Sequence, residues 1–363
     1  MARSLLAWWS EKGRAGIPWK CLPNGESPPP DQHLDPYRIW IAEAMLQQTQ
    51  LAVVIPYWQT WMEAFPTVEA LAAVSLQKVH LRWQGLGYYA RARRLHRAAQ
   101  RLVDQPWPQT LEGWMALPGI GRSTAGSILS SAFNAPAAIL DGNVKRVLSR
   151  LQAHPRPPAR EQALFWSWSE ALLDPIRPRD FNQALMDLGA TVCTPRNPSC
   201  DHCPWSQHCA AYAAGDPTRW PVTDERKPLP FQVIGIGVVL NAGGEVLIDQ
   251  RLEDGLLGGL WEFPGGKQEP DESIESCIKR ELKEELGIAV TVAEQLISID
   301  HAYSHKKLRF MVHLCHWVSG EPRPLASQQV RWVKPEELKE FPFPAANARM
   351  IKALMIWLAT AKA

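Results

Sequence analysis

Four of the seven cysteines are crowded into residues 193–209. The spacing there is Cys-x6-Cys-x2-Cys-x5-Cys, contributed by Cys193, Cys200, Cys203 and Cys209. Thiols so close together in a reducing compartment indicate a metal centre, because short spacers let one loop surround it. Four thiolates can hold an iron–sulfur cluster or a tetrahedral zinc ion. Zinc sites usually pair two Cys-x2-Cys knuckles and only one is present, so we favour the cluster over zinc and over four unligated thiols.

Two acidic residues of the N-terminal half have both an ordinary structural explanation and a chemical one. Glu43 lies among apolar neighbours such as Met45 and Leu46, whose burial would raise its pKa by desolvation. By itself it is a partly buried acid on an amphipathic helix. Asp141 precedes a helix expected over residues 145–151, and Asp often caps a helix start. Both explanations remain open on these residues alone.

A third group of acidic residues lies in the C-terminal third of the chain. Residues 266–288 read GKQEPDESIESCIKRELKEELGI, where Glu281, Glu284 and Glu285 have helical i, i+3 and i+4 spacing. All three then fall on one helix face, where like charges repel. This face is either a solvated acidic surface or a site whose divalent cation offsets the repulsion. Mg²⁺ prefers oxygen ligands and would suit a pyrophosphate substrate, so we expect a candidate magnesium site here.

Different elements must position these groups in the two halves of the chain. From Leu34 to about Ala213 apolar residues recur at helical spacing, most clearly over Tyr37–Val54, Ala90–Val103 and Ser123–Phe133. A Pro-rich, charged segment around residues 215–230 predicts a linker. Beyond it we expect a helix over Ser273–Leu286 and strands over Gln232–Leu240, Glu245–Gln250 and Leu308–Val318.

Length and composition indicate a folded protein with more than one core. The chain has 363 residues, of which 46% are hydrophobic and 21% charged. The net charge is only +2, but basic residues cluster over 91–97 and 145–150, which weakly favours a nucleic-acid partner. No stretch reaches the roughly 18 apolar residues of a membrane span, and no signal peptide is present. We therefore expect no membrane association and a cytoplasmic, nucleoid-associated protein of bacterial type.

A hairpin sequence and the segments after it resemble a known superfamily. Leu117-Pro118-Gly119-Ile120-Gly121 allows a tight turn whose backbone N–H groups can hold a phosphate, although alone it could be an ordinary interhelical turn. Followed by Asp141 and the cysteine loop, it resembles the helix–hairpin–helix DNA glycosylases of the endonuclease III and MutY superfamily. The cysteine spacing matches their [4Fe–4S] loop. The resemblance implies that Asp141 is catalytic and that DNA contacts involve Leu117, Gly119, Gly121 and Ser123.

Ser123 also bears on the type of reaction. Relatives that cut the DNA backbone carry a Lys there as Schiff-base nucleophile. The resemblance therefore implies a monofunctional glycosylase, which removes the base and leaves the strand intact.

The segment Ile41–Gln50 (IAEAMLQQTQ) closely resembles the MutY family. The resemblance implies that Glu43 is the general acid towards adenine N7 and that Asp141 stays ionised to stabilise the oxocarbenium ion, as in glycoside hydrolysis. Asn143 would orient the attacking water or Asp141. The adenine must be flipped out of the duplex, and Gln48 and Tyr88 match the positions that wedge beside the lesion. Without the resemblance, Tyr88 is equally explained as a core aromatic residue.

Residues 266–288 fit every position of the Nudix box, G-x5-E-x7-R-E-U-x-E-E-x-G-U. The MutY family commonly ends in a Nudix-fold domain whose box has decayed, so an intact box is a departure. His301-Ala302-Tyr303-Ser304-His305 resembles the family loop that reads 8-oxoguanine, which implies stacking by Tyr303, hydrogen bonding by Ser304 and a DNA contact at His305. Phe343–Asn347 resembles a MutT segment that reads the oxidised purine. We expect recognition as the main role and leave hydrolysis of 8-oxo-dGTP open.

These observations predict a multidomain protein. We expect an all-α helix–hairpin–helix glycosylase with a [4Fe–4S] loop over residues 1–222, a linker over 223–230 and an α+β Nudix-fold domain over 231–363. The expected enzyme is a monomer that hydrolyses the N-glycosidic bond of adenine paired with 8-oxoguanine, and with guanine, in double-stranded DNA. The alternatives are a pyrimidine glycosylase, a non-catalytic lesion-binding protein and a Nudix hydrolase tethered to DNA. The Pro-rich stretch over residues 20–34 is expected to be an extra surface loop.

Overall fold

The structure, a computed structural model, describes residues 1–14, 16–225, 228–303 and 306–361. The chain divides into two compact units. One unit combines Met1–Ala73 with Arg97–Arg226, and the other combines Val74–His96 with Lys227–Ala363. A segment of the helical half therefore packs with the C-terminal part of the chain. Ser304 and His305, two of the predicted 8-oxoguanine contacts, lie outside the described residues.

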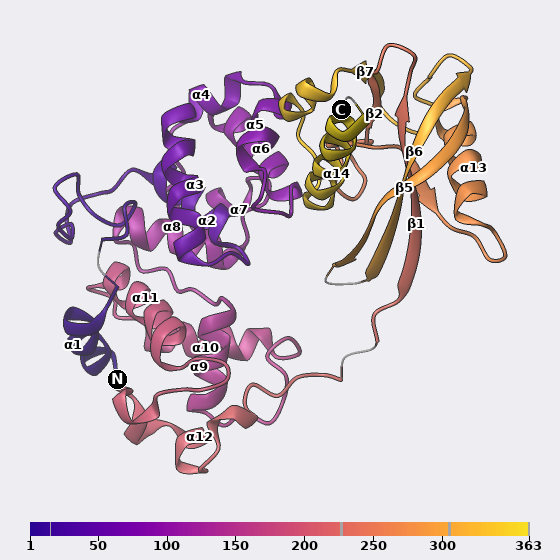
Figure 1. Ribbon diagram of the computed structural model, residues 1–363. Coiled ribbons are helices and arrows are strands. Elements are labelled where there is room, and N and C mark those ends of the chain that lie inside the picture. The colour runs from indigo at the N-terminus through magenta and orange to yellow at the C-terminus, as the bar shows by residue number, and fades with distance from the viewer. Residues whose placement is uncertain (15, 226–227, 304–305, 362–363) are drawn as a thin grey trace. The chain divides into compact units, whose positions relative to one another are not determined.

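Helices build the first unit (Figure 1), and α2 shows why they begin where they do. Asp35 accepts a hydrogen bond from the backbone N–H of Tyr37, with Pro36 at the first helical position. The cap satisfies an N–H group that the helix start leaves unpaired, and Pro has no N–H to lose. The helical elements up to residue 219 are α1 (Ala2–Lys12), α2 (Pro36–Leu46), α3 (Leu51–Ala64), α4 (Val68–Ala73), α5 (Leu76–Trp83), α6 (Ala90–Leu102), α7 (Leu111–Met115), α8 (Arg122–Phe133), α9 (Gly142–Leu151), α10 (Gln162–Leu172), α11 (Pro178–Asp187), the π-helical turn η1 (Leu188–Val192), the 3₁₀ turns η2 (Cys200–His202) and η3 (Ser206–His208), α12 (Ala210–Ala213) and the 3₁₀ turn η4 (Pro217–Arg219). Of these, α5 and the start of α6 belong to the second unit.

The helix expected over Tyr37–Val54 is interrupted, so this prediction is wrong between Leu46 and Leu51. Gln48 has a φ of 61°, in the left-handed region that a right-handed helix cannot contain. Neither proline nor glycine marks the break, so nothing in the local sequence indicates it. The helices expected over Ala90–Val103 and Ser123–Phe133 are confirmed as α6 and α8.

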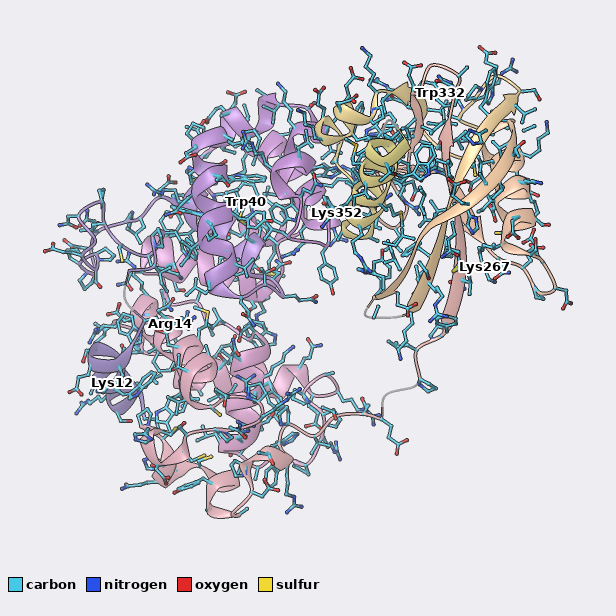
Figure 2. All side chains as sticks on the ribbon, viewed as in Figure 1. Lys12, Arg14, Trp40, Lys267, Trp332 and Lys352 are labelled. Carbon is cyan, nitrogen blue, oxygen red and sulfur yellow. The ribbon has the colours of Figure 1, made fainter. Side chains whose placement is uncertain are left out.

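The core of the first unit encloses α2 almost completely. Ile39, Trp40 and Ile41 are at most 1% exposed, and α2 packs against α8. Trp40 is labelled among these helices in Figure 2. A further apolar cluster joins α1, α9, α10 and α11. Because packing holds α2 on nearly all sides, Glu43 is carried into the interior of the unit.

The second unit is built on one mixed sheet. Its strands follow the order β3-β2-β1-β6-β5, with β4 also beside β1 and β7 beside β2. Of the strand pairs within the described residues, only β1 and β6 run parallel. Apolar clusters lie on both faces, one with α14 and the other with α13 (Figure 1). The elements after residue 230 are β1 (Phe231–Leu240), β2 (Val246–Gln250), β3 (Trp261–Glu262), β4 (Gly265–Lys267), α13 (Ile274–Leu286), β5 (Ala289–Ala302), β6 (Lys307–Ser319), β7 (Gln329–Val333), the 3₁₀ turn η5 (Pro335–Glu340) and α14 (Ala345–Ala361).

This architecture confirms the expected class, an all-α part followed by an α+β part. The strands and the helix predicted after the linker are found as β1, β2, β6 and α13. Among the described helices, none is both long enough and apolar enough to cross a bilayer.

Candidate active site and cofactor sites

All the predicted catalytic residues line one cavity of the first unit. The cavity has a volume of about 620 Å³, within the usual range for small-molecule sites. Its wall includes Glu43 from α2, Ser123 from α8, and Asp141 and Asn143 from the start of α9. The helices bring them together because α2 packs on α8, while α11 packs on both α8 and α9.

The surroundings of Glu43 favour its protonated form. Its side chain is 13% exposed, and its Oε1 atom is buried without a hydrogen-bond partner among the described residues. Lys20 Nζ lies 3.8 Å from that oxygen. Burial raises the pKa of Glu43, the charge of Lys20 opposes the shift and the charge of Asp141 adds to it. Glu43 can therefore hold a proton at a pH at which an exposed glutamate would have lost it.

Asp141 is both a helix cap and a residue of the cavity. Its Oδ1 accepts a hydrogen bond from the Val144 backbone N–H at 2.7 Å, the geometry of an N-cap. Its Oδ2 accepts a longer one from Asn143 Nδ2 at 3.4 Å. The cap thus occupies one carboxylate oxygen, and the ordinary and the chemical explanations of Asp141 are compatible.

Asn143 is held by Arg146 of the same helix, which is itself bonded to η1 and to the cysteine loop. Its Oδ1 accepts from Arg146, which also donates to the carbonyl oxygens of Gly189 and Cys193. Gly189 lies so close that a Cβ on it would be 2.7 Å from the Cβ of Asn143. Glycine at 189 therefore lets η1 approach the start of α9. The hydrogen bond from Arg146 fixes the orientation of the Asn143 amide.

Sequence reasoning missed part of the cavity wall. Lys20, Arg14 and Gln183 also line it, the first two from the segment after α1 and the third from α11. Lys20 is buried, donates to Ser131 Oγ, and has its pKa lowered by that burial. The available signal was the pair of basic residues, Arg14 and Lys20, on either side of Pro18-Trp19.

The predicted hairpin lies between α7 and α8. Gly119 has a φ of 84°, which only glycine adopts without strain, and Gly121 precedes the first residue of α8. Leu117 closes the turn by accepting the backbone N–H of Ile120 at 3.3 Å. Ser123 Oγ accepts the backbone N–H of Leu140 at 3.0 Å, so its hydroxyl ties α8 to the segment that leads to Asp141.

Gln48 and Tyr88, the predicted wedge residues, share an unusual backbone conformation. Both have positive φ values, 61° and 48°, which cost energy for residues other than glycine. Tyr88 is 52% exposed, and the Arg91 guanidinium lies 5.5 Å from its ring centroid. Gln48 belongs to the first unit and Tyr88 to the second. Gln48 itself is not among the residues lining the cavity, although its neighbours Gln47 and Gln50 are.

The four clustered cysteines surround one small space. All four line it together with Arg150, whose guanidinium donates to Cys193 Sγ at 3.3 Å and to the Thr194 carbonyl at 2.7 Å. Arg150 is 1% exposed, so a buried cation faces the thiols and suits an assembly that carries negative charge. Among the described residues, no three thiols, imidazoles or carboxylates are already gathered as around one ion. Four thiols that line one space beside a buried cation can hold either a tetrahedral ion or an iron–sulfur cluster.

A second acidic site lies in the second unit. A cavity of about 380 Å³ is lined by Glu285 together with Asp249 of β2 and Glu262 of β3. Burial raises the pKa of Asp249, with Glu262 and Glu285 adding to it. Burial and the charge of Glu281 raise the pKa of Glu285 to about 7. Carboxyls with such shifts are typical of a site that gathers negative charge around a cation.

The three predicted magnesium ligands are not equivalent. Glu285 lines the cavity. Glu281 packs against Gly266 so closely that a Cβ added to Gly266 would lie 2.1 Å from the Glu281 carboxyl carbon. Glu284 is 61% exposed and pairs with Arg280 at 3.2 Å. Asp249 and Glu262 were missed because they lie on strands outside the box.

The predicted purine-reading residues border this second cavity. Tyr303 and Asn347 both line it, and the rings of Tyr303 and His301 are 4.6 Å apart. Asn347 is 6% exposed, which is low for a polar side chain. Of the three predicted contacts in the reading loop, Tyr303 falls within the described residues, whereas Ser304 and His305 lie outside them.

Family comparisons agree with these sites in chain order. Residues 41–170 match the HhH-GPD superfamily of base excision DNA repair proteins, residues 193–209 the iron–sulfur binding domain of endonuclease III, and residues 235–353 the NUDIX domain. The solved structure of a thermostable thymine-DNA glycosylase is similar, with a TM-score of 0.52, 26% identity, and coverage of 59% of this chain and 95% of that one. Fold and site define a base excision repair glycosylase with an iron–sulfur loop and a Nudix domain.

Relatives that match most of the chain narrow this class. The adenine DNA glycosylase of Homo sapiens is 35% identical over 98% of this chain and 73% of its own length. That of Mus musculus is 35% identical over 92% of this chain and 74% of its own length. The chain belongs to the adenine DNA glycosylase family. It is therefore an enzyme, which excludes a purely lesion-binding protein, and Cys193, Cys200, Cys203 and Cys209 form an iron–sulfur loop rather than a zinc site.

Proposed function

We propose that this adenine DNA glycosylase acts on adenine opposite 8-oxoguanine, and opposite guanine, in double-stranded DNA. The observation that carries the proposal is that Glu43 and Asp141 line one cavity large enough for a flipped base. Their environments differ, with Glu43 buried and Asp141 capping α9. Two carboxyls in different surroundings can divide the roles of acid and anion.

In this mechanism Glu43 donates a proton to adenine N7, which makes the base a better leaving group. Its raised pKa keeps that proton available at a higher pH than on an exposed glutamate. Asp141 faces the sugar as an anion and stabilises the positive charge that develops as the bond breaks. Asn143 orients the free Asp141 oxygen through the 3.4 Å hydrogen bond. Ser123 offers no amine, which supports a monofunctional enzyme.

We propose that the remaining predicted residues contact the DNA. Gln48 and Tyr88 would fill the gap left by the flipped adenine, and their strained backbone supports a special role. The hairpin residues Leu117, Gly119, Gly121 and Ser123 would hold the DNA backbone at the start of α8. On the opposite strand, the 8-oxoguanine would be read by Tyr303, Ser304 and His305.

The test uses labelled duplexes with adenine opposite 8-oxoguanine, guanine or thymine, and a duplex with thymine glycol. We expect adenine loss from the first two only, with strand breakage only after alkali. E43Q and D141N should lower the single-turnover rate at least about a hundredfold. Breakage without alkali would contradict the monofunctional mechanism, and normal rates in either variant would contradict the catalytic roles.

We also propose a [4Fe–4S] cluster on the cysteine loop, where it would tie the loop to α9. The proposed domain bounds are 1–222 for the glycosylase, 223–230 for the linker and 231–363 for the Nudix domain. They are supported by family matches that end at residue 209 and resume at 235. We further propose a monomeric, cytoplasmic enzyme, since iron–sulfur thiols are kept reduced in that compartment.

A second activity has a specific observation in its favour. Besides an intact Nudix box, the second unit holds Asp249, Glu262 and Glu285 around one cavity. We propose that Glu285, with Glu281 and Glu284 close by, binds Mg²⁺ through carboxylate oxygens. The bound ion would neutralise a pyrophosphate group, so hydrolysis of 8-oxo-dGTP stands as the second candidate function beside recognition.

A further inference from the structure

Asp187, the last residue of α11, is a completely buried carboxylate surrounded by donors. Its side chain is 1% exposed. Oδ2 accepts hydrogen bonds from Trp9 Nε1 at 3.0 Å and from the Arg14 backbone N–H at 2.9 Å. Oδ1 accepts from Arg14 Nε at 2.7 Å and from Gln183 Nε2 at 2.8 Å. A buried charge is tolerated only when paired in this way, so the network has little freedom.

Two of these partners face the candidate active site. Arg14, labelled in Figure 2, and Gln183 both line the cavity that contains Glu43 and Asp141, whereas Asp187 does not. Trp9, the remaining partner, belongs to α1 and is not part of the cavity wall. Asp187 therefore reaches the cavity wall through its hydrogen bonds to Arg14 and Gln183 and, by its charge, through Lys20.

The chemistry of a carboxylate decides how the Gln183 amide is turned. An ionised carboxylate paired with Arg14 only accepts hydrogen bonds, so Gln183 must present its NH₂ group to it. The amide oxygen then points elsewhere, and no described residue donates to it. An asparagine at 187 could donate as well as accept, and would allow either orientation of the Gln183 amide.

We propose that Asp187 is a positioning residue for base selection, which holds the Gln183 amide with its oxygen available to the base. The inference rests on the proposed assignment of this cavity as the adenine site. An amide oxygen accepts a hydrogen bond from an exocyclic amine, which adenine carries and unsubstituted purine lacks. A site built to bond such a group discriminates against an analogue without it.

The experiment compares full-length wild type, D187N and W9F on duplexes with adenine or unsubstituted purine at one position, opposite 8-oxoguanine. The readout is the ratio of the two single-turnover excision rates. We expect D187N to lower the adenine-to-purine ratio about tenfold, the effect of one hydrogen bond. W9F removes a bond to the same carboxylate without touching the cavity, so its ratio should equal that of wild type.

A purely structural role of Asp187 would lower both rates together and leave the ratio unchanged, and this result would overturn the proposal. A changed ratio in W9F would overturn it as well. If D187N does not fold, Gln183→Met removes the amide while keeping Asp187. An unchanged adenine-to-purine ratio in Gln183→Met would likewise overturn the proposal. Normal activity of E43Q and D141N would instead refute the assignment of the cavity, so the two failures are distinguishable.

Discussion

Burial controls the chemistry of the charged groups around Glu43. Glu43 and Lys20 have side chains no more than 13% exposed and lie 3.8 Å apart, yet neither has the pKa of an exposed residue. Burial raises the pKa of Glu43 and lowers that of Lys20, because it penalises the charged form of each. Lys20 works against the shift of Glu43, since a nearby cation stabilises the carboxylate. The pKa of Glu43 therefore depends on a residue that no catalytic motif includes.

This dependence predicts the pH profile of adenine release. Glu43 must be protonated to act as an acid, so the rate should fall as pH rises through its raised pKa. Lys20→Met removes the cation that favours ionisation, so the alkaline limb of the profile should move to higher pH, whatever the change in maximal rate. The measurement is single-turnover excision over a pH series, with the exposed Lys12→Met as control. A limb that stays in place, or moves down, would contradict the role of Glu43 as the acid.

Among the elements, α9 and η1 meet beside Asp141 and Asn143, two of the proposed catalytic residues. α9 starts with its Asp141 cap, and Asn143 in its first turn lies against Gly189 of η1. Arg146 bonds Asn143 and the backbone of η1 at the same time. The cysteine loop follows η1 directly, so this packing connects the iron–sulfur loop with the start of α9.

The contact predicts different outcomes for two glycines close to each other. In Gly189→Ala the new Cβ would lie 2.7 Å from Asn143 Cβ, so η1 and α9 must separate. We expect a loss of about 1–3 kcal/mol in the free energy of unfolding, and slower excision. Gly142→Ala meets nothing within 4 Å and should change stability by no more than about 0.5 kcal/mol. Denaturant unfolding of both variants measures this, and equal destabilisation would argue against close packing at Gly189.

At the scale of the whole molecule, the chain carries two acidic cavities of different character. The cavity of the first unit combines carboxyls with Lys20 and Arg14, whereas the cavity of the second gathers Asp249, Glu262 and Glu285 with Arg251. Arg251 is already engaged with Glu262 at 2.6 Å. The first arrangement suits proton transfer to a base, and the second suits a divalent cation.

The second cavity predicts a separable metal site. Glu285→Gln should weaken binding of Mn²⁺, a probe for Mg²⁺, by about tenfold or more, because it removes a charged oxygen ligand. It should also abolish Mg²⁺-dependent turnover of 8-oxo-dGTP if wild type shows it. Glu275→Gln is the matched control, since Glu275 is exposed on the same helix and does not line the cavity. Metal affinity is measured by titration of the full chain, and equal affinities of wild type and Glu285→Gln would exclude this site.

Motifs made of neighbouring residues could be interpreted from the sequence alone. The cysteine spacing, the hairpin before α8 and the Nudix box each lie within one short segment, so their geometry follows from local backbone rules. The same holds for α8 and α13, whose apolar spacing predicts them well. The break at Gln48 does not follow from such rules, because the residues around it would continue a helix.

Only the tertiary structure decided which distant residues share a cavity with the motifs. Lys20 and Gln183 lie far from Glu43 in the chain, and packing of α11 and of the segment after α1 brings them into its cavity, with Asp187 bonded to Gln183 outside the cavity wall. Asp249 and Glu262 likewise come together through the pairing of β2 with β3, and they share a cavity with Glu285 of α13. Local spacing carries no information about such contacts, since burial and charge at a site depend on every element packed around it. The sequence alone thus determined the class of chemistry, and the fold decided which charged groups and amides surround each acid.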